Sequence, residues 1–182
     1  RVVAHHYKIF EQYHAQKLPH EQLYWESLKT FTSIEELGFA NFVEYNLPAL
    51  LCHLALVHTA IDDTESALKY FRIAEKYIEP TQKGEVLYTR VLNNLASIYK
   101  ERKLFDQGIA CCQKIIALHQ KLNPDNDRSK WRNCFWVGLA SLDIAEMLID
   151  RGDLLEGERY ATSGYQLCKS DGSKEIVAEY DA

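Results

Sequence analysis

The chain has 182 residues, of which 47% are hydrophobic and 26% are charged, and its formal net charge is −5. This composition is typical of a globular protein with one sizeable core, and it excludes a disordered or low-complexity chain. The acidic balance argues against a nucleic-acid groove in this segment, because such a surface needs clustered Lys and Arg side chains to displace the counterions of the phosphates.

The first predicted hairpin covers residues 1–37. Val3, Tyr7 and Phe10 recur at helical spacing, which indicates one amphipathic helix. Pro19 opens the second run, and a proline is tolerated in the first turn of a helix. We therefore expect a degenerate leading hairpin at this end of the chain.

The second hairpin is predicted over residues 39–79. Pro48 is awkward inside a continuous helix and implies either a kink or a late helix start. Asp62, Asp63 and Thr64 then supply the turn and the N-cap of the next helix.

The third hairpin, residues 84–122, has the clearest pattern. Apolar residues recur at steps of three and four in both halves, so each helix has one apolar stripe. The stripes consist of Leu92, Leu95, Ala96 and Tyr99, followed by Gly108, Cys112, Ile115 and Ile116. Lys103 and Leu104 leave room only for a tight turn between the helices. We expect Ala96 and Gly108 to lie where the two helices touch.

The fourth hairpin is predicted over residues 129–170. Ser129 is placed as the cap of a long helix, and Gly152 and Asp153 form the turn into its partner. Residues 173–182 are expected to begin a further helix that is cut short. The whole chain, residues 1–182, is therefore predicted to form one array of about four helical hairpins.

Three of these hairpins share one spacing. The step is sixteen residues from Leu51 to Ala67, from Leu92 to Gly108 and from Ser141 to Gly157, and Ala55, Ala96 and Ala145 each stand twelve residues before the second member. This pattern resembles the tetratricopeptide repeat (TPR). The resemblance implies an all-α fold, an α-α superhelix in which each helical hairpin is one repeat.

A weaker resemblance concerns residues 136–141, WVGLAS, together with the turn at Gly152 and Asp153. This segment is similar to TPR arrays that form the sensory part of bacterial signalling proteins and transcription regulators. The resemblance implies an input domain whose output module lies elsewhere. Trp131, Phe135 and Trp136 are interpreted instead as core residues of a long helix.

Candidate catalytic and metal-binding residues are lacking in the sequence. The histidines do not have the spacing of a helical zinc site, and we predict no metal and no cofactor. Cys111 and Cys112 lack the Cys-x-x-Cys spacing of redox thiols, and core packing is the favoured role. No phosphate-binding loop or nucleophile elbow is visible, so we predict that the chain is not an enzyme.

The predicted binding surface is the concave face, which the first helix of each stacked hairpin lines. Its residues are Arg90, Asn93, Asn94, Ser97, Lys100 and Glu101 in the third hairpin, His53 and Leu56 in the second, and Asp143 and Glu146 in the fourth. Asn93 and Asn94 can pair with the backbone of an extended peptide, although either could instead bridge helices. Arg90 and Lys100 would then select an acidic or phosphorylated segment. Residues 91–96, VLNNLA, resemble the corresponding helix in repeat proteins of the kinesin light chain type.

The predicted function is therefore protein or peptide binding without catalysis, as the sensory or interaction domain of a larger regulator. The alternatives are a self-association scaffold, with homo-oligomers, and an enzyme with a site in the concave groove. Five cysteines at helical positions suit free thiols in a reducing compartment, so we expect a cytoplasmic protein, with a periplasmic sensor segment as the alternative. No apolar run approaches the roughly 20 residues of a transmembrane helix.

Overall fold

The computed structural model describes residue 8 and residues 20–37, 47–78, 84–122 and 127–169. From residue 20 onward these ranges form seven helices and no strand, so the predicted all-α class is confirmed. The chain divides into two compact units, Arg1–Glu79 and Pro80–Ala182, and each is described by itself. Whether they continue one repeat array stays a prediction. Within the described ranges, no helix has both the length and the apolar character needed to cross a bilayer.

The first unit contains α2 (His20–Leu37), α3 (Leu47–Ala60) and α4 (Thr64–Tyr77). Helices α3 and α4 form the predicted second hairpin, and α2 packs on α3. Helix α3 begins at Leu47, so Pro48 stands in its first turn and the late start is confirmed. Leu50, Leu54 and Phe71 are fully buried in this core. The first helix of the leading hairpin lies outside the described residues except for Lys8, and so does the predicted truncated helix at residues 173–182.

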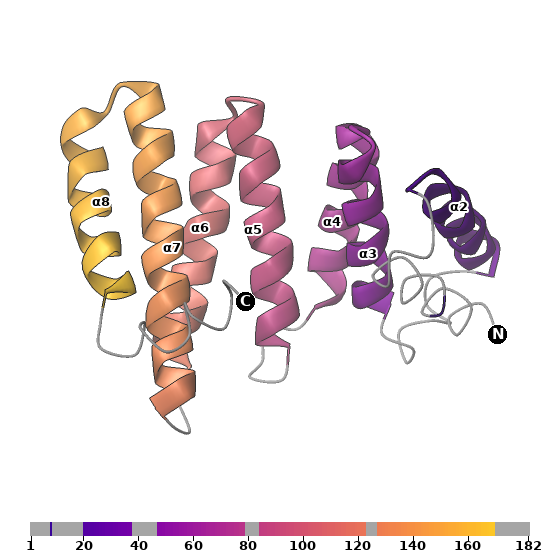
Figure 1. Ribbon diagram of the computed structural model, residues 1–182, viewed down its shortest axis with the longest axis horizontal. Helices are drawn as coiled ribbons and strands as arrows, with labels where there is room; N and C mark the ends of the chain where they lie inside the picture. Colours follow the sequence, from indigo (N-terminus) through magenta and orange to yellow (C-terminus); the bar gives the residue numbers. More distant parts are fainter. Residues whose placement is uncertain (1–7, 9–19, 38–46, 79–83, 123–126, 170–182) are drawn as a thin grey trace. The chain divides into compact units, whose positions relative to one another are not determined.

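The second unit contains α5 (Glu85–Glu101), α6 (Phe105–Lys121), α7 (Asp127–Arg151) and α8 (Leu154–Cys168). The four helices stand side by side in chain order, and each packs on the next (Figure 1). They are the third and fourth predicted hairpins. One boundary was wrong: α7 begins at Asp127, so Ser129 lies inside the helix and is not its cap.

The same turn closes all three described hairpins. In α3–α4, the backbone N–H of Asp63 donates to the carbonyl of His58 at 2.9 Å, and Asp62 has a positive φ of 61°. Lys103 and Gly152 occupy the equivalent positions with φ values of 58° and 99°. This is the Schellman arrangement, in which a left-handed residue lets the last helical carbonyls find partners. The repeated turn explains why three different sequences give one hairpin geometry.

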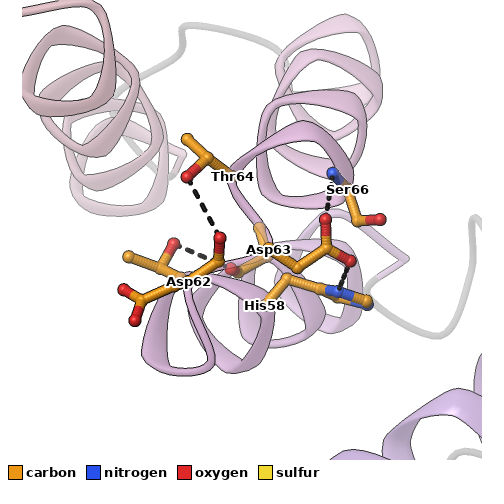
Figure 2. A network of polar contacts seen from close by, with 7 residues as sticks. His58, Asp62, Asp63, Thr64 and Ser66 are labelled. Carbon is orange, nitrogen blue, oxygen red and sulfur yellow. Dashed lines mark hydrogen bonds and ion pairs between the residues drawn. The ribbon is translucent and has the colours of Figure 1, made fainter. Parts of the chain in front are cut away.

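A side-chain network reinforces the first of these turns (Figure 2). Asp63 is the N-cap of α4, as predicted: its Oδ1 accepts a hydrogen bond from the backbone N–H of Ser66 at 3.2 Å. Its Oδ2 lies 2.9 Å from Nδ1 of His58, on the preceding helix. Hydrogen bonding to Ser66, first through its side chain and then through its backbone N–H, lowers the pKa of the Asp63 carboxyl, because it stabilises the charged form. The cap therefore joins the end of α3 to the start of α4.

Gly108 lies at the contact of α5 and α6, as its spacing from Ala96 predicts. A Cβ added at Gly108 would lie 3.4 Å from the carbonyl oxygen of Ala96, but only 2.5 Å from Sδ of Met147 on α7. Three helices therefore meet at this position, which the sequence pattern of one hairpin could not indicate.

The left-handed turn residues lead to a stability prediction. Gly152→Ala should lower the free energy of unfolding by about 1 kcal/mol, because its φ of 99° strains any L side chain. Space is not the cause, since a Cβ at Gly152 meets nothing within 4 Å. The opposite change, Lys103→Gly, should be neutral or stabilising, because it relieves the same strain. The free energy of unfolding of both variants is measured in urea. If both variants lost the same stability, backbone strain would not control this turn.

Candidate functional site

The predicted binding residues of α5 form an accessible ridge. Arg90, Ser97 and Glu101 are exposed, and the remaining three, Asn93, Asn94 and Lys100, are half-buried. Residues 90, 93, 97 and 100 follow helical spacing, so their side chains share one side of the helix.

The two asparagines differ in their contacts. Asn94 donates from Nδ2 to the carbonyl of Arg90 at 2.8 Å, so this amide is used within its own helix and does not bridge two helices. Asn93 accepts from the Ser97 hydroxyl through its backbone carbonyl at 3.1 Å. Its side-chain amide has no hydrogen-bond partner among the described residues. Asn93 is therefore the amide on this ridge that is available to a ligand.

Lys100 joins the ridge to α7. Its Nζ donates to Oε2 of Glu146 at 2.9 Å, across 46 positions of sequence. This bond, together with the charges of Asp143 and Asp150, raises the pKa of Lys100. Burial raises the pKa of Asp143, and the nearby Lys100 ammonium opposes that shift. Three predicted site residues, Lys100, Asp143 and Glu146, are thus brought together. We name Asn93, Lys100, Asp143, Glu146 and Asp150 the α5–α7 face.

The charges on this face do not favour the acidic segment expected from the sequence. Lys100 is already paired with Glu146, and the carboxylates of Asp143 and Asp150 also lie near it. One ammonium among three carboxylates leaves the neighbourhood net negative. An incoming cation is therefore favoured over an incoming anion at this end of α5.

His53 and Leu56 are the predicted site residues of the first unit. Both are half-buried on α3. Their position on a surface shared with α5 stays a prediction, because they belong to the other unit.

A buried polar network connects α5, α6 and α7, and it was missed in the sequence. The Thr89 hydroxyl lies 2.8 Å from Nε2 of His119, and Nδ1 of His119 lies 3.0 Å from Oδ1 of Asn133. A neutral imidazole protonated on Nδ1 satisfies both contacts: it donates to Asn133 and accepts from Thr89. Beside it, Arg132 donates to the buried carboxylate of Glu85. Burial lowers the pKa of His119, which favours the neutral ring.

The sequence did contain a signal for this network. His119 occupies the α6 position that corresponds to Ile78, the C-cap of α4, and to Cys168 in α8, so a polar residue replaces an apolar one in the repeat pattern. A buried polar side chain needs partners, and Thr89 and Asn133 supply them. Because each ring nitrogen already has a partner, the network is structural in character.

The aromatic residues of α7 flank this network and are half-buried, which corrects their interpretation as core residues. Trp131 and Phe135 stack with ring centroids 5.1 Å apart, and Phe135 meets Trp136 edge-on at 5.7 Å. Trp136 in turn stacks on His119 at 6.4 Å. They form a cluster at the edge of the core.

The vicinal cysteines pack in the core as predicted. Cys112 is fully buried, and Cys111 is also buried. Burial raises the pKa of the Cys112 thiol to about 12, so it stays protonated near neutral pH and is a poor nucleophile.

Comparison of the chain with protein-family models, curated proteins and solved structures finds no match. The function is therefore inferred from the geometry of the described helices.

Proposed function

We propose that this chain is a non-catalytic binding module of TPR type, and that the α5–α7 face of its second unit binds an extended peptide segment carrying basic side chains. The observation that carries the proposal is the half-buried Asn93 amide, which has no hydrogen-bond partner in the described ranges and lies on the same ridge as the Lys100–Glu146 pair. The repeated Schellman turn and the small residues at the helix contacts support the TPR assignment. A role as the sensory or interaction domain of a larger regulator is part of the same proposal.

Two kinds of contact would hold such a peptide. The Asn93 side chain offers one acceptor and two donors, so it can pair with a backbone amide whatever the peptide sequence. Lys100 is two helical turns further along, about 10 Å away, where Asp143 and Asp150 would attract a Lys or Arg side chain. The rigidity of the face favours binding, because α5 and α7 are already fixed by the buried Thr89–His119–Asn133 contacts.

The test uses an arrayed library of peptides that differ in net charge, probed with the full chain. We expect basic peptides to be enriched, with binding that weakens as salt is added. Asn93→Ala should weaken the enriched peptides by about tenfold, since a lost pairing costs about 1 to 3 kcal/mol. Its melting temperature should hardly change, because the Asn93 amide makes no hydrogen bond to any of the described residues.

The control is Gln107→Ala, which removes an exposed amide from α6. It should bind like the wild type. Enrichment of acidic peptides, or equal weakening by both variants, would contradict the proposal. An unfolded Asn93→Ala variant would instead assign Asn93 a structural role.

Self-association is the second candidate function, and α8 supplies the observation that favours it. Leu154 and Leu155 are 65% and 68% exposed, and Tyr165 is 55% exposed on the same helix. Large apolar side chains at such exposure are common in interfaces. Sedimentation equilibrium separates the two candidates, because a binding module can be monomeric whereas a scaffold cannot.

All five cysteines are free thiols, and three of them are buried. This supports the proposal of a reducing compartment such as the cytoplasm.

A further inference from the structure

A groove lies between α6 and α8, away from the residues of the α5–α7 face. Its volume is about 540 Å³, within the range of small-molecule sites. Helix α6 forms one wall, α8 forms the other, and two residues of α7, Val137 and Ser141, lie between them. All of these residues belong to the second unit.

The lining combines an apolar part with unused polar groups. Ile116, Ala117, Val137 and Leu167 supply the apolar surface. The polar side chains with no hydrogen-bond or ion-pair partner among the described residues are Gln113, Gln120, Arg159, Tyr160 and Ser163. Ser141 differs, because its hydroxyl donates to the carbonyl of Val137 at 2.8 Å. Gln113, Gln120, Arg159 and Ser163 are exposed and Tyr160 is half-buried, so their hydrogen-bonding groups are accessible to a ligand in the groove.

Arg159 is the one charged residue in this lining. Glu156, one turn earlier on α8, makes no ion pair with it, and neither does any other carboxylate of the described ranges. The chain has a net charge of −5, but the lining of this groove carries one guanidinium and no carboxylate, so the lining itself is positively charged. A planar guanidinium pairs best with a carboxylate, through two parallel hydrogen bonds.

We propose that the groove between α6 and α8 binds an organic carboxylate with an apolar body. The carboxylate pairs with Arg159, the body lies on Ile116, Val137 and Leu167, and the Gln and Ser side chains bind its polar substituents. Two sources share this chemistry: a free carboxylic acid and the C-terminal carboxylate of a short peptide. The proposal is independent of peptide binding at the α5–α7 face, because the two surfaces have no residue in common.

The test compares matched ligands by calorimetric titration of the full chain. The probes are octanoate against octanamide, and an acetylated Leu-Val-Leu peptide with a free C-terminus against its C-terminal amide. We expect at least one carboxylate to bind with a dissociation constant below about 1 mM and its amide to bind at least about tenfold more weakly. Preference for octanoate identifies a free acid as the source, and preference for the peptide identifies a C-terminus.

The variants locate the site. Arg159→Gln should reduce carboxylate binding about tenfold and leave amide binding unchanged. Ala117 is an exposed residue of the groove lining, so the indole of Ala117→Trp should occupy the groove and weaken binding of both carboxylates and amides. Arg102→Gln is the matched control, because it removes an exposed guanidinium outside the groove lining. Equal binding of acids and amides, no effect of Arg159→Gln, or no binding of either carboxylate at about 10 mM would overturn the proposal.

Discussion

Gly164→Ala is expected to lower the free energy of unfolding by about 2 kcal/mol, although alanine is the better helix former by about 1 kcal/mol. A Cβ at Gly164 would lie 2.8 Å from the carbonyl oxygen of Gly138 and 3.1 Å from the backbone nitrogen of Leu142, both on α7. Side chains can move aside, but these neighbours are backbone atoms. The two helix axes must separate, and overpacking of this kind costs about 1 to 3 kcal/mol or more.

The measurement is chemical denaturation, with Thr162→Ala as the control. Thr162 is exposed on the same helix, so its replacement gains helix propensity without a clash. We expect the free energy of unfolding to fall in Gly164→Ala and to stay unchanged or rise in Thr162→Ala. If both variants unfold like the wild type, α7 and α8 do not cross as closely as their backbones indicate.

The hairpins were predictable because a local pattern determines them. Ala96 and Gly108 are twelve residues apart across a turn, and a close helix contact at that separation requires small residues on both sides. Position 103 was predicted only as a turn, yet its backbone adopts the same left-handed conformation as Asp62 and Gly152. Helix propensity and apolar spacing act over a few residues, so one sequence is sufficient for them.

Contacts between hairpins were harder to predict from the sequence. Asp143 and Glu146 were assigned to the same face as Lys100, but nothing in the spacing indicated that Glu146 bonds to Lys100 at 2.9 Å. That bond, together with the carboxylates of Asp143 and Asp150, is the reason that we propose a basic partner. Gly138 belongs to the short segment that suggested a sensory domain, and it lies at the α7–α8 crossing, so packing accounts for it.

The groove around Arg159 was missed for a different reason. The sequence predicts binding on the concave face, whereas the groove is lined mainly by the second helices of the hairpins, α6 and α8. Its polar residues, such as Gln113 and Ser163, are ordinary surface residues when read in sequence. That they have no hydrogen-bond partner among the described residues is visible only in three-dimensional contacts.

His119→Leu is the second change with a large expected effect, and we expect it to lower the free energy of unfolding by about 2 to 4 kcal/mol. Leucine fills a similar volume, so the loss comes from its missing nitrogens. The Thr89 hydroxyl and the Asn133 amide, both buried, would each lose a partner, and an unsatisfied buried group costs about 1 to 3 kcal/mol. The triple variant Thr89→Val, His119→Leu, Asn133→Leu should recover part of the loss, because no polar group is then left without a partner. If the single variant is as stable as the wild type, the network does not hold the three helices together.

The same histidine should make stability depend on pH. Burial lowers the pKa of His119 in the folded chain, so the unfolded chain binds the proton more readily. The stability that the neutral ring contributes is therefore fully present above the unfolded pKa of about 6.5, and it is lost as the pH falls from that value toward the folded pKa. Uptake of one proton changes the free energy of unfolding by at most about 1.4 kcal/mol per pH unit.

The test measures this pH dependence by urea unfolding. His119→Gln, which keeps a donor and an acceptor but does not titrate, should reduce the slope between about pH 6.5 and 5. Asn133→Asp should also reduce it, because a carboxylate 3.0 Å from Nδ1 would stabilise the imidazolium. An unchanged slope in both variants would mean that another group controls the acid stability of this unit.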